Sequence, residues 1–213
     1  MPIRGRRNDS KMMQINELLS LQNRSKSSIQ IQAHQPKNDT DRTNSMSTFF
    51  AQPYNIDAVG FYFGDAETYA EQSGSLKDAF GNPVEEFEIQ FIDGEDAELF
   101  SACGINQGSM PVWFDSVIDL NDLEKAALYY LCGELGYAVD VALDKLGEVS
   151  LYEGDLQAAA DELFDEIYLD GVPDAVRAYI DYEKFARDCE LGGDMTEFDF
   201  KGTTWTCTNA SGM

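Results

Sequence analysis

The chain has 213 residues and a formal net charge of −24, and 43% of its residues are hydrophobic and 12% aromatic. This composition supports hydrophobic cores and excludes disorder throughout, and the length suits one large domain or two to three small ones. Residues 1–45 carry eight Lys/Arg against four Asp/Glu, whereas residues 46–213 carry seven against 35, so the second region alone has a net charge of −28.

Residues 1–45 are rich in Asn, Gln, Ser and Arg and contain no aromatic residue. We predict a disordered basic tail, because such a segment cannot bury enough apolar surface to fold. One interpretation is a basic arm that folds onto the acidic body, residues 46–213, or binds nucleic acid. The interpretation that we favour is that Met46, where the composition changes, is the natural start and that the tail is upstream sequence.

Residues 46–96 predict a small α/β unit. The segment 58–63 (AVGFYF) indicates a buried strand, and 65–80 indicates one or two short helical pieces. In 84–94 (VEEFEIQFIDG) apolar side chains alternate with Glu and Gln, which is typical of a half-buried strand.

Residues 97–147 predict a helical section. A first helix begins after Asn121 as its N-cap, carries its leucines on one face and ends at Gly136. A second helix is expected over 137–147, where apolar residues recur at helical spacing.

Residues 148–213 predict helices followed by antiparallel β-structure. Asp155 is placed to cap a helix, and Pro173 begins helical periodicity that runs to residues 191–193. The segment 195–209 alternates on both sides of Lys201-Gly202, which predicts a β-hairpin. The fold class expected from these patterns is therefore α+β, in three small sections: 46–96, 97–147 and 148–213.

Residue types that carry catalysis or bind metals are scarce in the body. The only histidine, His34, lies in the tail, which excludes Ser-His-Asp, Cys-His and imidazole-ligated metal sites after residue 45. There is no phosphate-binding GxxxxGK[ST] loop and no GxGxxG after a strand. The acids of 93–100 (DGEDAELF) lack the spacing of an EF-hand. We expect no enzyme activity, cofactor or metal, with a hydrolase that uses an acid pair as a minor alternative.

Cysteine spacing and the absence of long apolar runs bear on the cellular compartment. The four cysteines, Cys103, Cys132, Cys189 and Cys207, include no CxxC pair, and we predict buried, reduced thiols. No run approaches the ~18 apolar residues that a membrane span needs, and the basic N-terminus lacks the apolar core of a secretion signal. The sequence predicts a cytoplasmic protein.

Four carboxylates, Asp161, Glu162, Asp165 and Glu166, stand at helical spacing with no Lys or Arg among them. Like charges at i,i+4 repel by roughly 0.2–0.5 kcal/mol per pair, and repulsion across the whole body opposes folding. Such a bias is useful in a surface that must resemble a polyanion. Duplex DNA carries two charges per base pair, so 28 charges correspond to about 14 base pairs, and two copies to about 28.

The carboxylates that we expect to contact a partner form two groups along the sequence. They are Asp161, Glu162, Asp165, Glu166 and Asp170 in the third section, and Glu85, Glu86, Glu88, Glu95, Asp96 and Glu98 in residues 85–98.

Residues 171–198 (GVPDAVRAYIDYEKFARDCELGGDMTEF) form the most distinctive sequence motif in the chain. They resemble the C-terminal signature of the ArdA antirestriction proteins, in which a proline-led helix runs into Y-I-D-Y-E, then a basic residue and Asp, then L-x-G-D before a strand. Segments 85–95 and 150–166 are also similar, so we expect the likeness to span 54–208. The matching residues are Pro173, Tyr179, Ile180, Asp181, Tyr182, Glu183, Arg187, Asp188, Leu191, Gly193 and Asp194.

This resemblance implies three small domains in a curved, elongated homodimer whose acidic surface imitates bent B-form DNA. The mimic would occupy the DNA-binding groove of a type I restriction-modification enzyme, at its methyltransferase/specificity core, and so protect mobile genetic elements. On that basis the acidic side chains stand in for phosphates, and no direct contact with nucleic acid or membrane is expected. The alternative is a generic acidic adaptor that binds another basic, DNA-binding protein.

The residues of the signature also have simpler interpretations from their spacing. For Tyr179, Ile180, Tyr182 and Phe185 we favour packing, in the core or at an interface, over direct contact with a partner. We expect Arg187 to pair locally, with Glu183 or with Asp188. Gly193 is expected to end a helix in a left-handed conformation.

The change of composition at Met46 predicts that residues 1–45 are dispensable. A protein that starts at Met46 should keep its fold, measured by circular dichroism, and its protection of unmodified phage DNA on a restricting host. A truncated protein that stays folded and no longer protects would show that the basic tail is functional.

Overall fold

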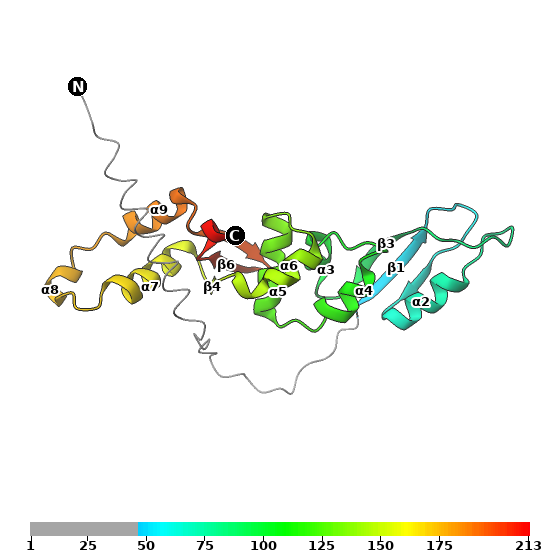
Figure 1. Cartoon of the computed structure of the whole chain (residues 1–213), viewed down its shortest axis with the longest axis horizontal. Helices are drawn as coiled ribbons and strands as arrows, with labels where there is room; N and C mark the ends of the chain where they lie inside the picture. Colours follow the sequence, from blue (N-terminus) through cyan, green and yellow to red (C-terminus); the bar gives the residue numbers. More distant parts are fainter. Residues whose placement is uncertain (1–46) are drawn as a thin grey trace, which may run out of the picture. The chain divides into compact units, whose positions relative to one another are not determined.

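The computed structural model describes residues 47–213, which belong to one compact unit, Asn44–Met213 (Figure 1). The predicted tail, residues 1–45, lies outside the described residues. Helices and two small antiparallel sheets make up the described part, which confirms the α+β class. The domain boundaries after residues 96 and 147 stay a prediction. Within residues 47–213, no helix is both long and apolar enough to cross a membrane.

The first sheet has the strand order β2-β1-β3, with β1 at Thr48–Pro53, β2 at Phe61–Phe63 and β3 at Phe87–Asp93. Helix α2 (Ala66–Ser75) follows β2. The strands expected within 58–63 and 84–94 are confirmed, but the sequence pattern does not indicate the central strand β1. Two adjacent aromatic residues hide its alternation, because Phe49 is fully buried while Phe50 packs on Tyr62 on the other face.

Short helices fill the chain between the two sheets. Their order is α3 (Ala97–Ala102), α4 (Met110–Val112), the π-helical turn η1 (Trp113–Val117), α5 (Asp122–Tyr129), the π-helical turn η2 (Tyr130–Glu134), α6 (Val139–Lys145) and the 3-10 turn η3 (Leu146–Glu148). The predicted cap of α5 is confirmed as a capping box, in which the Asn121 side chain accepts from the Glu124 backbone N–H at 3.0 Å. Gly136, at φ 73°, follows this helical run as expected.

The C-terminal part combines three helices with the second sheet, whose strand order is β4-β6-β5. Its elements are β4 (Leu151–Glu153), α7 (Leu156–Tyr168), α8 (Asp174–Arg177), α9 (Tyr182–Gly192), β5 (Thr196–Phe200), β6 (Thr203–Cys207) and the 3-10 turn η4 (Ala210–Gly212). The predicted cap of α7 is confirmed, since Asp155 accepts from the Ala158 backbone N–H at 2.8 Å. The predicted hairpin is also confirmed, and both Lys201 (φ 51°) and Gly202 (φ 74°) are left-handed, as a tight two-residue turn requires. The three-residue strand β4 carries no clear sequence signal.

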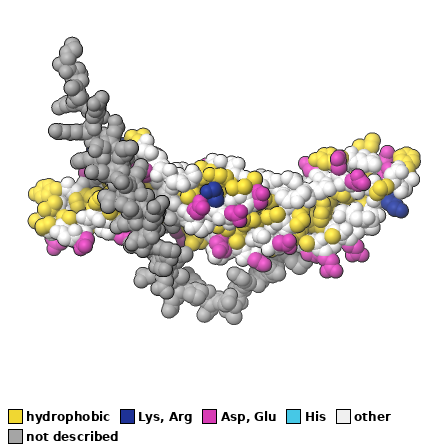
Figure 2. Space-filling model, in the orientation of Figure 1, with side chains coloured by type: hydrophobic (Ala, Val, Ile, Leu, Met, Phe, Trp, Pro, Cys, Tyr) yellow, Lys and Arg dark blue, Asp and Glu magenta, His cyan; other side chains and the backbone are white. Residues whose placement is uncertain are grey.

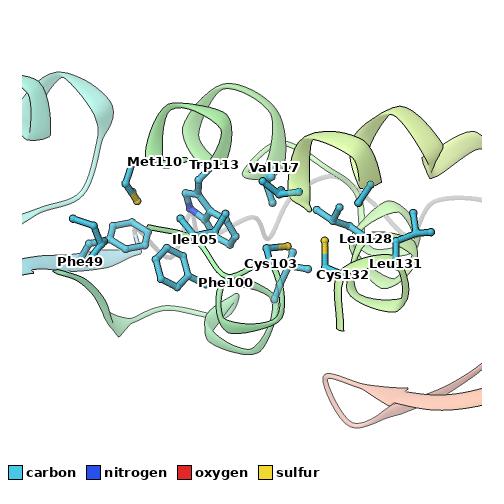
Figure 3. Close-up of a cluster of buried hydrophobic side chains, with 14 of the residues drawn as sticks. Phe49, Phe100, Cys103, Ile105, Met110, Trp113, Val117, Leu128, Leu131 and Cys132 are labelled. Atoms are coloured by element: carbon cyan, nitrogen blue, oxygen red, sulfur yellow. The ribbon is translucent and has the colours of Figure 1, made fainter. Parts of the chain in front are cut away.

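One cluster of buried side chains runs from the first sheet through the helices to the second sheet. Figure 3 shows its central part, where Phe100 lies 5.1 Å from Trp113 and 5.5 Å from Phe49 between ring centroids. At the other end Tyr129 stacks on Phe200 of the hairpin at 4.7 Å. These contacts couple the stability of all three sections.

All four cysteines are free and buried, which confirms the prediction of buried thiols. Cys103 and Cys132 lie next to each other in the core (Figure 3). The hydrogen bond with Cys132, together with burial, raises the pKa of the Cys103 thiol. Cys103 is therefore an uncharged packing residue at neutral pH.

Asp96 is the centre of an ion-pair triad that joins the three sections. Its side chain is nearly buried, and its two oxygens accept from Lys125 Nζ of α5 at 2.7 Å and from Lys201 Nζ of the hairpin turn at 2.6 Å. The backbone N–H of Lys201 also donates to Glu98 at 3.1 Å. Burial alone would raise the pKa of Asp96, but the hydrogen bonds and charges of the two lysines outweigh it, so this pKa is lowered. The triad therefore favours the charged carboxylate in the folded state.

The triad predicts that Asp96→Asn destabilises the fold strongly at pH 7. Removing one member of a buried ion pair leaves uncompensated charge and typically costs about 3–5 kcal/mol, measured as the free energy of unfolding in urea. Because the folded pKa of Asp96 is lowered, its contribution is present above the unfolded pKa and is lost as pH falls through the folded pKa. The difference between wild type and variant should therefore shrink below about pH 4.

The matched control is Asp93→Asn, an exposed acid three residues away in β3. This change should alter stability by no more than about 0.5 kcal/mol. Equal stabilities of Asp96→Asn and Asp93→Asn at pH 7 would contradict the role of the triad.

Candidate acidic interaction surface

The acidic residues of the described chain lie almost entirely at the surface. Of the 35 Asp/Glu residues within 47–213, 30 are exposed, three are half-buried and two, Asp96 and Asp194, are buried. Figure 2 shows acidic side chains recurring along the visible face, where basic side chains are sparse. The acid bias of the sequence therefore becomes a surface property.

The few basic side chains are mostly engaged with nearby acids. Five of the seven Lys/Arg residues within 47–213 are held in ion pairs, namely Lys125 and Lys201 with Asp96, Lys145 with Glu148, Arg177 with Asp174 and Lys184 with Asp188. The three pairs outside the Asp96 triad are exposed and contribute little to stability, in the range of about 0–1 kcal/mol each. Their larger effect is on the surface potential, because each neutralises a base and leaves the remaining carboxylates in excess.

Helix α7 carries the first group of predicted contact residues and packs on α9. Ala160 of α7 is buried in a small cluster with Ala186 and Cys189 of α9. Further along, the Phe164 ring lies 5.3 Å from Tyr182 and 5.0 Å from Phe185 between centroids. This packing fixes which face of α7 remains exposed.

The acids of α7 and its C-terminal end fall into two kinds. Glu162, Glu166 and Asp170 are exposed, as a contact surface requires. Asp161 is half-buried and accepts from the Gln157 side chain at 2.6 Å. Asp165 is exposed and accepts from the Tyr182 hydroxyl of α9.

Asp165 therefore has a structural role as well as a charge. The hydrogen bond with Asp165 raises the pKa of Tyr182, because the carboxylate holds the hydroxyl proton, and desolvation adds a smaller increase. The contact links the two helices at the point where their ring cluster lies. Asp165 serves the α7–α9 packing as well as the acidic surface.

The second group of predicted contact residues lies around β3 and the start of α3. Glu85, Glu86, Glu88, Glu95 and Glu98 are exposed.

The prediction that Asp96 belongs to this contact group is wrong, because Asp96 is only 7% exposed and is bound by two lysines. Its sequence neighbours give no sign of this, since the lysines that bury it lie 29 and 105 positions away. Sequence reasoning also missed exposed acids on the central helices, such as Asp140 and Asp144 of α6. Their place on the polar face of a predicted helix was the available signal.

Much of the signature in 171–198 builds helix α9. Asp181 caps it by accepting from the Lys184 backbone N–H at 3.0 Å, and Gly193 ends it at φ 73°, as predicted. Tyr182 and Ile180 are half-buried, and Asp194 is buried after the helix. The signature is thus largely a set of helix caps and packing residues.

Other signature residues are exposed. Tyr179 is 87% and Leu191 79% exposed, so Tyr179 does not belong to the core, and its place at an interface stays a prediction. Glu183 is also exposed. The expected pairing of Arg187 with Asp188 is not made, because Asp188 pairs with Lys184 at 2.6 Å and no described acid lies within ion-pair distance of Arg187.

The described residues define an acid-rich α+β protein whose carboxylates spread over the surface. Within residues 47–213 no three His, Cys, Asp or Glu side chains converge in a way that could hold a metal ion.

The family comparison agrees with the resemblance of the signature. The chain matches the family model described as antirestriction protein (ArdA) over residues 14–200. It therefore belongs to the ArdA family, and its function is antirestriction. The match begins 40 residues before the expected start at residue 54 and includes part of the tail. No curated protein and no solved structure matches the chain.

The two kinds of acid on α7 predict opposite effects of neutralisation on stability. Asp165→Asn should lower the melting temperature, because the amide is a weaker acceptor for the Tyr182 hydroxyl. Glu162→Gln should leave it unchanged or raise it slightly at low salt, because a like charge at i,i+4 from Glu166 is removed. Thermal unfolding of both variants is the measurement, and a lower melting temperature for Glu162→Gln alone would contradict the assignment.

Proposed function

We propose that the chain is a non-catalytic inhibitor whose acidic surface imitates B-form DNA and occupies the DNA-binding groove of a type I restriction-modification enzyme. The proposed contact residues are the exposed acids of the two groups. They are Glu162, Asp165, Glu166 and Asp170 in the first group, and Glu85, Glu86, Glu88, Glu95 and Glu98 in the second. Binding at the methyltransferase/specificity core would exclude substrate DNA and so protect mobile DNA in the cytoplasm.

The observation that carries this proposal is the exposure of 30 carboxylates on a surface where five of seven bases are already paired. A groove that binds DNA is lined with Lys and Arg that neutralise phosphates, and carboxylates of high surface density can meet the same groups. Long-range attraction between such surfaces also speeds association. Mere solubility needs far less charge than this, about 2–8 for a small domain.

We further propose that the protein acts as a homodimer, as the family resemblance implies. Two copies would double the length of the mimic. The exposed side chains of Val176, Tyr179 and Leu191 support the proposal, because large apolar side chains of this exposure are typical of contact surfaces.

The runner-up function is an acidic adaptor for another basic, DNA-binding protein. The charge pattern supports it equally, but the family membership favours restriction enzymes as the target. Binding to a histone-like protein without relief of restriction would favour the adaptor.

The proposal predicts how protection in cells depends on charge. Unmodified phage should plate far more efficiently on a type I restricting host that expresses the protein. The triple variant Glu162→Gln, Glu166→Gln, Asp170→Asn should lose about tenfold or more in affinity for the enzyme, because each exposed charge contributes about 0–1 kcal/mol. Single changes should have little effect on plating.

The matched control neutralises three exposed acids outside the proposed surface, Glu67→Gln, Glu71→Gln and Asp119→Asn. The total charge changes equally in both triple variants. Equal loss of affinity in the two would show that net charge, and no particular surface, determines binding.

A further inference from the structure

Four large hydrophobic side chains stand exposed on two loops at one end of the first sheet. In the loop between β1 and β2, Ile56 is 95%, Val59 82% and Tyr54 65% exposed, and in the loop between α2 and β3, Phe80 is 77% exposed. Figure 2 shows hydrophobic side chains gathered at the right-hand end of the view, where these loops lie in Figure 1. We refer to Tyr54, Ile56, Val59 and Phe80 as the hydrophobic tip.

The two loops of the tip are joined to each other by hydrogen bonds. The Ala79 backbone N–H donates to the Asp57 carbonyl at 2.9 Å, and the Asn55 side chain donates to the Asp78 carboxylate at 3.3 Å. Asp78 also accepts from the backbone N–H groups of Phe80 at 2.9 Å and Asn82 at 2.8 Å. Loops restrained in this way lose less conformational entropy on binding, which raises the affinity for a partner.

The tip differs from the rest of the body in charge. Residues 54–60 and 77–83 contain two acids, Asp57 and Asp78, and one base, Lys77. The Asp78 carboxylate is used inside the loop, where hydrogen bonds from the Asn82 side chain and backbone lower its pKa. These two loops therefore carry little net charge, although the molecule is otherwise strongly acidic. A DNA-like surface has no need of such a feature.

We propose that the hydrophobic tip is a second docking surface, which packs against an apolar patch beside the DNA-binding groove of the same restriction enzyme. The inference rests on the proposed function and adds to it a contact that DNA itself cannot make. Exposed aromatic and aliphatic anchors of this kind mark protein–protein contacts and often carry much of the binding energy. The acidic surface would supply attraction and orientation, and the tip a contact that is insensitive to salt.

Continuity with the second acidic group selects this occupant. A basic groove that attracts the acids beside the tip also brings the tip against the rim of that groove. The tip is continuous with the second acidic group, because the Tyr54 backbone N–H donates to the Glu86 carbonyl at 3.2 Å and Glu85 and Glu86 are exposed. A partner that holds these acids therefore reaches the tip.

The test compares binding of the full chain to a purified type I enzyme at two salt concentrations. The variant Ile56→Ser, Val59→Ser, Phe80→Ser should lose about tenfold or more in affinity, by the same factor at low and high salt. The neutralised variant of the acids should instead lose most at low salt, because its deficit is electrostatic. The control is Leu135→Ser, Val141→Ser, which removes exposed apolar side chains of the central helices and should bind like wild type.

Separate readouts keep the outcomes distinct. Ile56→Ser alone, at a side chain that is 95% exposed, cannot disturb packing and should show part of the same loss. Wild-type affinity of the tip variant would overturn the tip while the proposed function stands. Failure of the wild-type protein to bind the enzyme would overturn both. A tip variant that turns from dimer to monomer in sedimentation would assign the tip to a second copy and overturn the proposal.

Discussion

The buried carboxylate of Asp96 is the interaction on which the connection of the three sections depends. It stands at the start of α3, where the first sheet passes into the helices, and binds one lysine of α5 and one of the hairpin turn. Two of the seven bases in the body are thus used at a single buried site. A buried ion pair is retained only where its geometry compensates for desolvation, and here both oxygens are satisfied. The stacked rings of Tyr129 and Phe200 complete the same junction.

This use of the bases explains how a protein with such an excess of acid can fold and still present a polyanionic surface. Repulsion among surface carboxylates opposes compaction, and it is offset by a hydrophobic cluster that runs through both sheets. Five of the seven lysines and arginines within residues 47–213 pair locally or hold the junction, so they interrupt the acidic surface little. The same side chains that stabilise the fold therefore help to define the acidic surface. Family membership gives the chain an antirestriction function, which we propose that this surface carries.

Local chemistry was predictable from the sequence, and long-range pairing was not. The caps at Asn121, Asp155 and Gly193 and the turn at Lys201-Gly202 follow from residues within four positions of one another, and all are confirmed. Strand β1 was missed because its identity is decided by pairing with β2 and β3, while Phe49-Phe50 conceals the alternation. Asp96 was placed on the surface because nothing beside it in the sequence distinguishes it from Glu95. Exposure of the α7 acids was expected from helical spacing, but the hydrogen bond between Asp165 and Tyr182 depends on how α9 packs.

The central claim is that the acidic surface takes the place of DNA in the groove of a restriction enzyme. It is tested most directly by equilibrium competition, in which a type I enzyme binds the labelled protein in the presence of increasing unlabelled duplex that carries its recognition site. We expect the duplex to displace the protein completely, with the apparent Kd of the protein rising linearly with duplex concentration. The enzyme's affinities for the protein and for the duplex should both weaken steeply with salt. A stable ternary complex of enzyme, duplex and protein would contradict mimicry, because a surface that replaces DNA cannot be bound beside it.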